Sequence, residues 1–144
     1  MIEQDTVKLL RECDAGVKMG IKSIEDVLDA VRSQELARIL SECKREHKVL
    51  EAEIEEQLRR FEDAGKEPGM MAKSMSYMKT GMKLAMEHSD ETVADLITDG
   101  CHMGVKSLCR YLNQYKAADE YAKDIAKRLI HLEQQLSQDM QNYL

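Results

Sequence analysis

The chain has 144 residues, of which 43% are hydrophobic and 33% are charged, with 7 Gly, 1 Pro and no Trp. This length predicts a single domain over residues 1–144 with its own core. The scarcity of Pro, Gly and aromatic residues disfavours sandwiches, barrels and doubly wound sheets, so we expect an all-α fold. The net charge is −6, so the chain lacks the basic surface stripe that nucleic-acid binding requires.

The first predicted helix begins near Asp5 or Thr6, either of which can cap it, and ends near Arg32. Its apolar positions alternate three and four residues apart, which is typical of a helix in a bundle. One position of this stripe is polar, and it is occupied by Asp14. The apolar members are Val7, Leu10, Val17, Ile21, Ile24, Leu28 and Val31.

Ser33 can cap a second helix, whose stripe has the same spacing and again one polar member, His47. Gly65 and Pro68 predict that this helix ends near Gly65. The apolar members are Leu36, Leu40, Cys43, Leu50, Ile54 and Phe61.

A connector over about residues 65–88 follows, and it is too long for a simple turn in a compact domain. Methionines at helical spacing predict a short helix within it that packs on the bundle, since Met fills irregular gaps. Lys73, Lys79 and Lys83 also make it the only basic segment, so docking to a partner or a membrane surface is the alternative. The methionines are Met71, Met75, Met78, Met82 and Met86.

Ser89 or Asp90 can cap a third helix, and a fourth helix follows a tight turn near residues 117–119. Short connections join helices one to two and three to four, which predicts two antiparallel hairpins over about residues 5–64 and 89–144. The third stripe is Ile97, Cys101, Gly104, Leu108, Leu112 and Tyr115; the fourth is Ala122, Ile125, Leu129, Leu132, Leu136 and Met140.

The two hairpins resemble each other. AGVKMGIKSIEDVL (15–28) aligns with DGCHMGVKSLCRYL (99–112) at an offset of 84 residues, which indicates a duplicated hairpin. In the second helix of each hairpin the apolar stripes align at an offset of 86 residues. The offset of 84 found in the first helices would instead pair His47 with His131. Glycine inside a helix costs roughly 1 kcal/mol relative to Ala, so the repeated small faces indicate either close helix packing or room for a ligand. These faces contain Gly16, Gly20, Ser23, Gly100, Gly104 and Ser107.

The duplicated hairpins, the long connector and the C-x-x-G motif of Cys13 and Gly16, with the related Gly100-Cys101, resemble the ferritin-like superfamily. They are most similar to its uncharacterised bacterial four-helix bundles built from two hairpins. The resemblance implies an up-down-down-up bundle with a short helix in the crossover. It also implies a di-iron or di-manganese centre, which takes a Glu from each of two helices and a Glu-x-x-His from each of the others.

That ligand set is incomplete in this chain. Asp99 precedes His102 by three residues, but both lie off the apolar stripe of their helix. We therefore predict a bundle without a standard di-iron centre. The residues three positions before His47, His88 and His131 are Lys44, Ala85 and Arg128.

Asp14 and His47 are the polar members of the stripes, and their predicted heights differ by about 7 Å, which disfavours a shared metal. We expect His47 to be buried, bonded to backbone or Ser, and to fill the space left by Gly20. We expect Asp14 to be partly solvated near the bundle end, or to join Glu53 or Glu133 in a cation site. The candidate ligands of a non-standard metal site are His47, Glu46, Glu133 and Asp14.

Cys43 and Cys101 lie on the stripes and are expected to behave as small buried apolar groups without a histidine base. The cysteines have no C-x-x-C spacing and the N-terminus lacks the apolar stretch of a signal peptide, so we expect a cytoplasmic chain with reduced thiols. The expected surface histidines are His88, His102 and His131.

Two functions are consistent with these features. The first is a structural or interaction module, not an enzyme, that forms a homo-oligomer, most simply a dimer, with no nucleic-acid or membrane partner. The second is an iron- or manganese-binding protein for storage or peroxide chemistry. Hydrolase, kinase and dehydrogenase motifs do not occur in the sequence.

Overall fold

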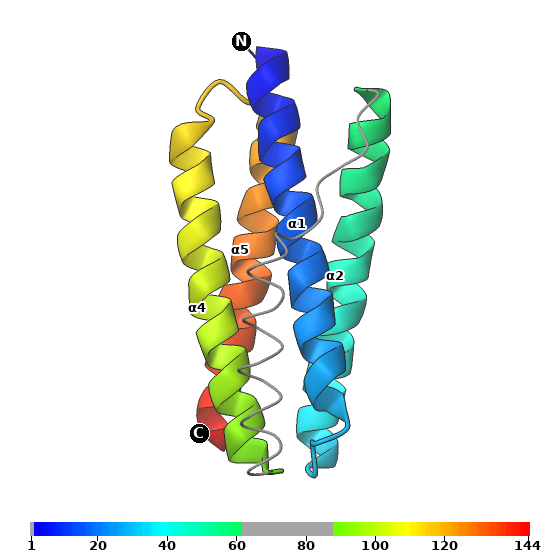
Figure 1. Cartoon of the computed structure of the whole chain (residues 1–144), viewed down its shortest axis with the longest axis vertical. Coiled ribbons are helices and arrows are strands. Elements are labelled where there is room, and N and C mark those ends of the chain that lie inside the picture. Colours follow the sequence, from blue (N-terminus) through cyan, green and yellow to red (C-terminus); the bar gives the residue numbers. More distant parts are fainter. Residues whose placement is uncertain (1, 62–87) are drawn as a thin grey trace.

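The computed structural model describes residues 2–61 and 88–144, which form long helices and no strand (Figure 1). The predicted all-α class is thus confirmed over these residues. The helix expected in the connector, with Met71, Met75, Met78, Met82 and Met86, lies outside them. The elements are α1 (Ile2–Leu28), α2 (Gln34–Arg60), α4 (Asp90–Gln114), α5 (Glu120–Met140) and a short 3-10 turn, η1 (Gln141–Tyr143).

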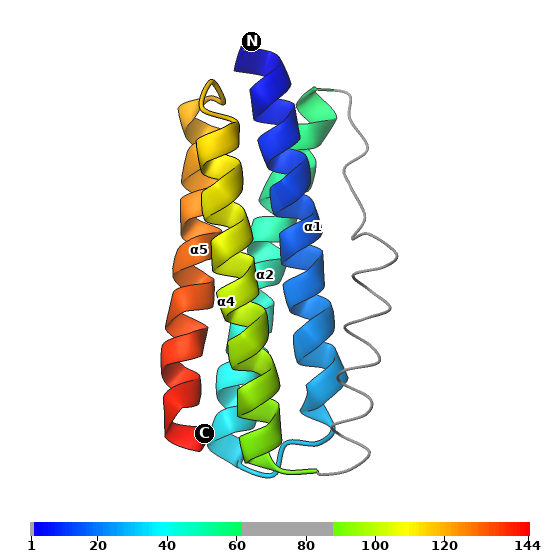
Figure 2. The ribbon, with the colours of Figure 1, turned by 60° about the vertical axis from the view of Figure 1, so that its left-hand side comes forward.

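The helices form two antiparallel hairpins, hairpin one (α1 and α2) and hairpin two (α4 and α5). α1 and α5 run in one direction while α2 and α4 run in the other, so the N- and C-termini lie at opposite ends (Figures 1 and 2). Between the hairpins, α1 contacts α4 and α5, and α2 contacts α5. The hairpins therefore pack against each other along their whole length.

Polar side chains cap three of these helices. The hydroxyl of Ser33 accepts a hydrogen bond from the backbone N–H of Leu36 at 3.2 Å, and Ser89 accepts one from Thr92 at 3.1 Å. Asp119 caps α5 in the same way. The predicted caps Ser33 and Ser89 are thus confirmed, since each satisfies an N–H that has no partner within the helix.

The predicted start and end of the first helix were wrong. α1 begins at Ile2 and ends at Leu28, so Asp5 and Thr6 lie inside the helix and do not cap it. Their side chains instead accept hydrogen bonds from the turn between α4 and α5: Asp5 from the N–H of Ala117 at 3.0 Å, Thr6 from that of Asp119 at 2.8 Å. Backbone N–H groups in a turn have no hydrogen-bond partner within a helix, and the side chains of Asp5 and Thr6 provide one.

An equivalent contact exists at the other end of the bundle. The carboxylate of Asp90 accepts hydrogen bonds from the N–H groups of Arg32 at 2.7 Å and Ser33 at 3.1 Å, in the turn between α1 and α2. Thr6 and Asp90 are 84 residues apart, whereas the two helix caps, Ser33 and Asp119, are 86 apart. The repeat therefore extends beyond the first helices to the turns and second helices, and each hairpin holds the turn of the other.

The core consists of two apolar clusters separated by a polar layer. His47 and Gly20 lie between the clusters along hairpin one, and Glu133 and Gly104 lie between them along hairpin two, so these residues share one level of the bundle. One cluster contains Leu9, Leu10, Cys13, Val17, Leu50, Ile54, Leu58, Leu108, Ile125 and Leu129; the other contains Ile24, Val27, Leu36, Leu40, Cys43, Val93, Ile97, Cys101, Leu136 and Met140.

Asp90→Ala should lower the free energy of unfolding by about 1–3 kcal/mol, because two turn N–H groups lose a charged acceptor. Glu91→Ala is the matched control, since Glu91 is the exposed neighbour on the same helix turn. Urea denaturation of both variants measures the difference. Equal stabilities of the two variants would show that this contact does not hold the hairpins together.

Candidate functional site at mid-bundle

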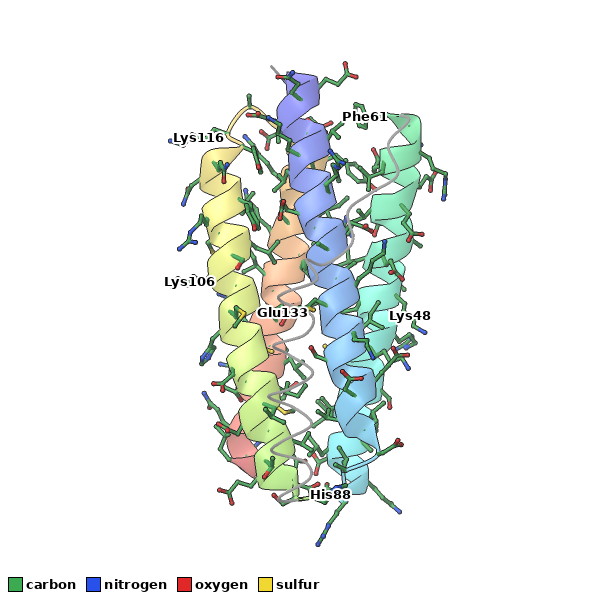
Figure 3. The ribbon with its side chains drawn as sticks, viewed as in Figure 1. Lys48, Phe61, His88, Lys106, Lys116 and Glu133 are labelled. Carbon is green, nitrogen blue, oxygen red and sulfur yellow. The ribbon has the colours of Figure 1, made fainter. Side chains whose placement is uncertain are left out.

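His47 of α2 and Glu133 of α5 meet in the interior of the bundle. His47 is fully buried and Glu133 is 7% exposed. The Nε2 atom of His47 lies 3.0 Å from Oε1 of Glu133, and Nδ1 lies 2.8 Å from the backbone oxygen of Cys43. Figure 3 places Glu133 at mid-height among the helices, whereas Lys48 and Lys106 extend outward.

Both ring nitrogens of His47 face acceptor oxygens, so the ring donates through Nδ1 to the carbonyl and through Nε2 to the carboxylate. Burial alone lowers the pKa of His47, but hydrogen bonds to the side chains of Cys43 and Glu133 outweigh burial and raise that pKa to about 10. The imidazolium and the carboxylate together carry no net charge. The layer is therefore a buried pair in which each charge is compensated by the other.

Glycines give this pair its space. A Cβ on Gly20 would lie 2.8 Å from Cδ2 and Nε2 of His47, and one on Gly104 would lie 3.6 Å from Cδ of Glu133. The expected filling of the Gly20 space by His47 is thus confirmed, as is its bond to backbone. Gly16 and Gly100 differ, because an added Cβ meets only Leu129 at 3.7 Å at the first and nothing within 4 Å at the second. Ser23 and Ser107 are half-buried.

Two cysteines border the pair. Cys43 and Cys101 are 6% and 2% exposed, as expected of small apolar groups. However, Sγ of Cys43 lies 3.5 Å from Nδ1 of His47, a cysteine–histidine contact that the sequence interpretation missed. Burial, then the charge of Glu133 and a hydrogen bond to it, raise the pKa of Cys101 well above its usual range. Since the Cys101 thiol stays protonated and buried, it does not serve as a nucleophile.

Asp14 was predicted to be partly solvated, and this was wrong. Its side chain is fully buried, and Oδ2 accepts a hydrogen bond from Nζ of Lys18 at 2.8 Å. Because α1 begins at Ile2, Asp14 lies a full turn deeper in the helix than the predicted start implied. It joins neither Glu53 nor Glu133.

Of the four candidate metal ligands, the structure brings together only His47 and Glu133. Glu46 is exposed although it precedes His47, because neighbouring residues point about 100° apart on a helix. Asp14 belongs to a different level of the bundle. In residues 2–61 and 88–144, no group of three or more His, Cys, Asp or Glu side chains has a geometry that holds a metal ion. The donors present therefore do not fit the di-metal centre that the family resemblance implies.

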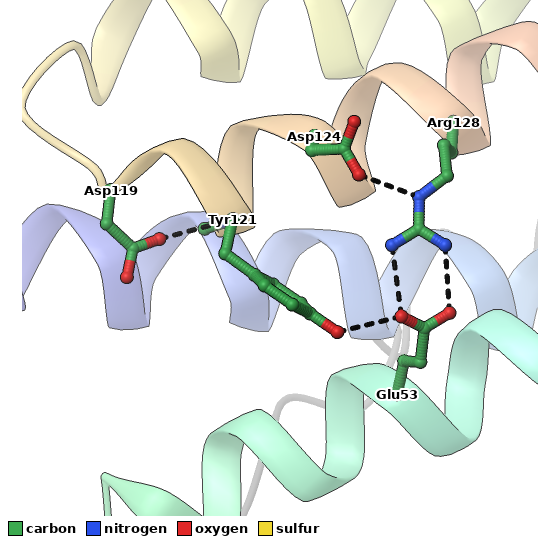
Figure 4. Close-up of polar contacts among 6 residues, drawn as sticks. Glu53, Asp119, Tyr121, Asp124 and Arg128 are labelled. Atoms are coloured by element: carbon green, nitrogen blue, oxygen red, sulfur yellow. Dashed lines mark hydrogen bonds and ion pairs between the residues drawn. The ribbon is translucent and has the colours of Figure 1, made fainter.

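A second polar contact links α2 to α5 nearer the surface (Figure 4). Arg128 donates two hydrogen bonds to the carboxylate of Glu53, at 2.9 and 3.0 Å, and Tyr121 donates a third at 2.8 Å. The bonds from Arg128 lower the pKa of Glu53. The Nε atom of Arg128 also donates to Asp124 at 3.0 Å. Sequence reasoning missed this cluster, because nothing in the spacing shows which turns of α2 and α5 lie opposite each other.

The remaining histidines lie at the surface. His88, His102 and His131 are exposed, as predicted. Two of them border an open groove of about 630 Å³ along α4 and α5, whose wall also includes one edge of Glu133. The lining residues are His102, Val105, Lys106, His131, Glu133, Gln134, Gln135, Ser137 and Gln138.

Comparison with known protein families, curated proteins and solved structures finds no match to this chain. Among the helices of the described residues, none combines the length and apolar character needed to cross a membrane. The site therefore has to be interpreted from its own geometry.

Gly20→Ala should destabilise the protein by about 1–3 kcal/mol, because the new Cβ overlaps an imidazole that hydrogen bonds hold on both sides. Gly100→Ala is the matched control, and it should stabilise by about 0.5–1 kcal/mol through helix propensity alone. Urea denaturation measures both. If Gly20→Ala were as stable as Gly100→Ala, the close contact with His47 would be refuted.

The stability of the wild type should fall with rising pH. The folded protein keeps the proton of His47 up to a pKa of about 10, whereas the unfolded chain releases it near 6.5. The stabilisation is thus complete below pH 6.5 and is lost toward pH 10, with a slope of up to about 1.4 kcal/mol per pH unit.

Denaturation between pH 6.5 and 7.5 tests this slope, about one pH unit below the pKa of cysteines in an unfolded chain. His47→Gln should be nearly flat over the same window, since it lacks the titrating group. A slope that survives unchanged in His47→Gln would assign the pH dependence to other residues.

Proposed function

We propose that the chain is a ferritin-like helical bundle that lacks a standard di-iron centre and acts as a structural or interaction module. The observation that carries this proposal is the mid-bundle layer. Where the family places bridging carboxylates, this chain has one imidazole and one carboxylate that compensate each other, at 3.0 Å. The two glycines that face the pair leave it room but add no ligand atoms.

Two features of the fold support the ferritin-like relation. The parallel course of α2 and α4 requires a long crossover between the hairpins, which is the connectivity that the superfamily uses (Figure 2). The reciprocal contacts of Thr6 with Asp119 and of Asp90 with Ser33 support a duplicated hairpin.

A binding role for the outer surface is supported by large apolar side chains that project into solvent. Met103 is 69% exposed and Val49 is 59% exposed, on different hairpins. Single exposed apolar residues are common on proteins, so these two are positions at which contacts in a homodimer or with another protein can be tested by mutation. The proposal includes cytoplasmic location and self-association, most simply as a dimer.

A metal-binding role is the second candidate, because His47 and Glu133 meet at mid-bundle with the thiols of Cys43 and Cys101 beside them. A metal there would have to displace the proton between Nε2 of His47 and the carboxylate of Glu133. The bond from Nδ1 to the carbonyl of Cys43 at 2.8 Å could remain, but His47 and Glu133 alone supply too few ligands. No group of three or more His, Cys, Asp or Glu side chains among the described residues has a geometry that holds a metal ion. The geometry thus favours the module over iron or manganese chemistry.

Metal titration separates the two candidates. Purified wild type, His47→Ala and Glu133→Gln are each titrated with Fe(II), Mn(II) and Zn(II), with circular dichroism as a check of folding. We expect no stoichiometric binding and no ferrous oxidation above the buffer rate in any of the three. One or two equivalents bound by the wild type and lost in a folded His47→Ala or Glu133→Gln would instead establish the metal-binding function.

A further inference from the structure

The pair His47 and Glu133 lies where the two halves of the repeat meet. Positions of α2 and α5 that are 86 residues apart are equivalent, and His47 and Glu133 are separated by that number. Other pairs at this offset are buried alike: Leu40 and Leu50 of α2 correspond to Ala126 and Leu136 of α5, and all four are at most 4% exposed. Each member of the pair therefore contacts its own counterpart across the pseudo-twofold axis.

A residue on such an axis would meet itself if a hairpin paired with the same hairpin of a second chain. Two copies of hairpin one would bring His47 against His47, and two copies of hairpin two would bring Glu133 against Glu133. In the first case, each imidazole would donate through Nδ1 to its own backbone carbonyl, so the two Nε2 atoms would face each other. If both rings were protonated at Nε2, two positive charges would meet; if neither were, two hydrogen-bond acceptors would meet. Two buried carboxylates repel each other unless they share a proton.

The ion pair of Glu53 with Arg128 has a similar effect on the pairing of two copies of hairpin one. The counterpart of Arg128 in hairpin one is Glu42, which is 86 residues earlier. Pairing of two copies of hairpin one would thus replace the two hydrogen bonds between Arg128 and Glu53 by an approach of Glu53 to Glu42, both acidic. In hairpin two the counterpart of Glu53 is Asp139, so two copies of that hairpin would still place an acid opposite Arg128. The surface contact therefore disfavours pairing of two copies of hairpin one, and the buried contact disfavours both like pairings.

The other contacts between hairpins do not make this distinction. Thr6 and Asp90 bind backbone N–H groups, which every turn offers, and the two apolar clusters consist mostly of the same types of aliphatic side chain. We infer that the charge pairs between α2 and α5, with His47 and Glu133 at their centre, make each hairpin pair with the other hairpin and exclude the matching hairpin of a second copy of this chain.

Two double variants of the full chain test this inference. His47→Gln/Glu133→Gln replaces the charges by amides, which pair equally well with themselves and so remove the discrimination. His47→Glu/Glu133→His exchanges the two groups and keeps it. The exchanged imidazole at position 133 has room, because Gly104 faces it as Gly20 faces His47.

Each protein is denatured, refolded at increasing concentration, and measured by size-exclusion chromatography with light scattering. For energy transfer, donor- and acceptor-labelled samples, labelled in the native state at the exposed Cys109, are refolded together. We expect wild type and the exchanged variant to give the same mass distribution and the same energy transfer. Relative to wild type, the Gln/Gln variant should show a species of doubled mass that is at least several-fold more abundant, together with higher energy transfer.

The circular dichroism spectrum shows whether the Gln/Gln variant folds, and His47→Leu/Glu133→Leu replaces it if it does not, because apolar side chains also lack the discrimination. A wild-type mass distribution in the folded neutral variant would overturn the inference. The inference would also be overturned if the exchanged variant formed as much of the double-mass species as the neutral variant, because charge complementarity would then have no effect. Association through the outer surface affects all variants alike and is subtracted with the wild type.

Discussion

The structure is organised around two buried ionisable groups whose charges compensate each other. An imidazolium and a carboxylate lie between two apolar clusters, where either alone would be strongly unfavourable. Their bond at 3.0 Å fixes the register of α2 against α5, because a shift of one residue would move both groups off the shared level. The same level needs glycine in α1, since a Cβ on Gly20 would overlap the imidazole, whereas a Cβ on Gly104 of α4 would make an ordinary contact with Glu133 at 3.6 Å. One polar contact thus sets constraints on α1, α2 and α5.

The duplicated backbone and the unequal side chains have separate roles. Reciprocal contacts between helix starts and turns are alike at both ends of the bundle, and they bring the hairpins together in an antiparallel arrangement. The side chains on the axis differ, since α2 contributes the base and α5 the acid. This difference determines that hairpin one pairs with hairpin two. A symmetric frame with complementary groups on its axis defines one pairing, whereas a fully symmetric one would define several.

Much of this fold could be predicted from periodicity and capping residues. The stripes gave the helices, and Ser33 and Ser89 gave two of their starts, because these signals are local. The partner of His47 was not predictable in this way. Hairpin two has two more residues ahead of its second helix, so the offset changes from 84 to 86, and identity alone suggests His131 in place of Glu133. The burial of Asp14 was missed because the start of α1 was predicted too late in the sequence. Asp5 and Thr6 resemble helix caps, but they accept hydrogen bonds from the turn between α4 and α5.

The buried pair is not explained by stability alone, since apolar residues of similar volume at such positions are often equally stabilising or better. Either a chemical role or a pairing role has to account for it. A chemical role needs an accessible donor or acceptor. Both nitrogens of His47 are bonded and the ring is fully buried, while the side chain of Glu133 is 10% exposed. A pairing role needs only that the groups be complementary and central, and both conditions are met. Among the described residues, the geometry at mid-bundle therefore fits recognition between the two hairpins better than it fits chemistry.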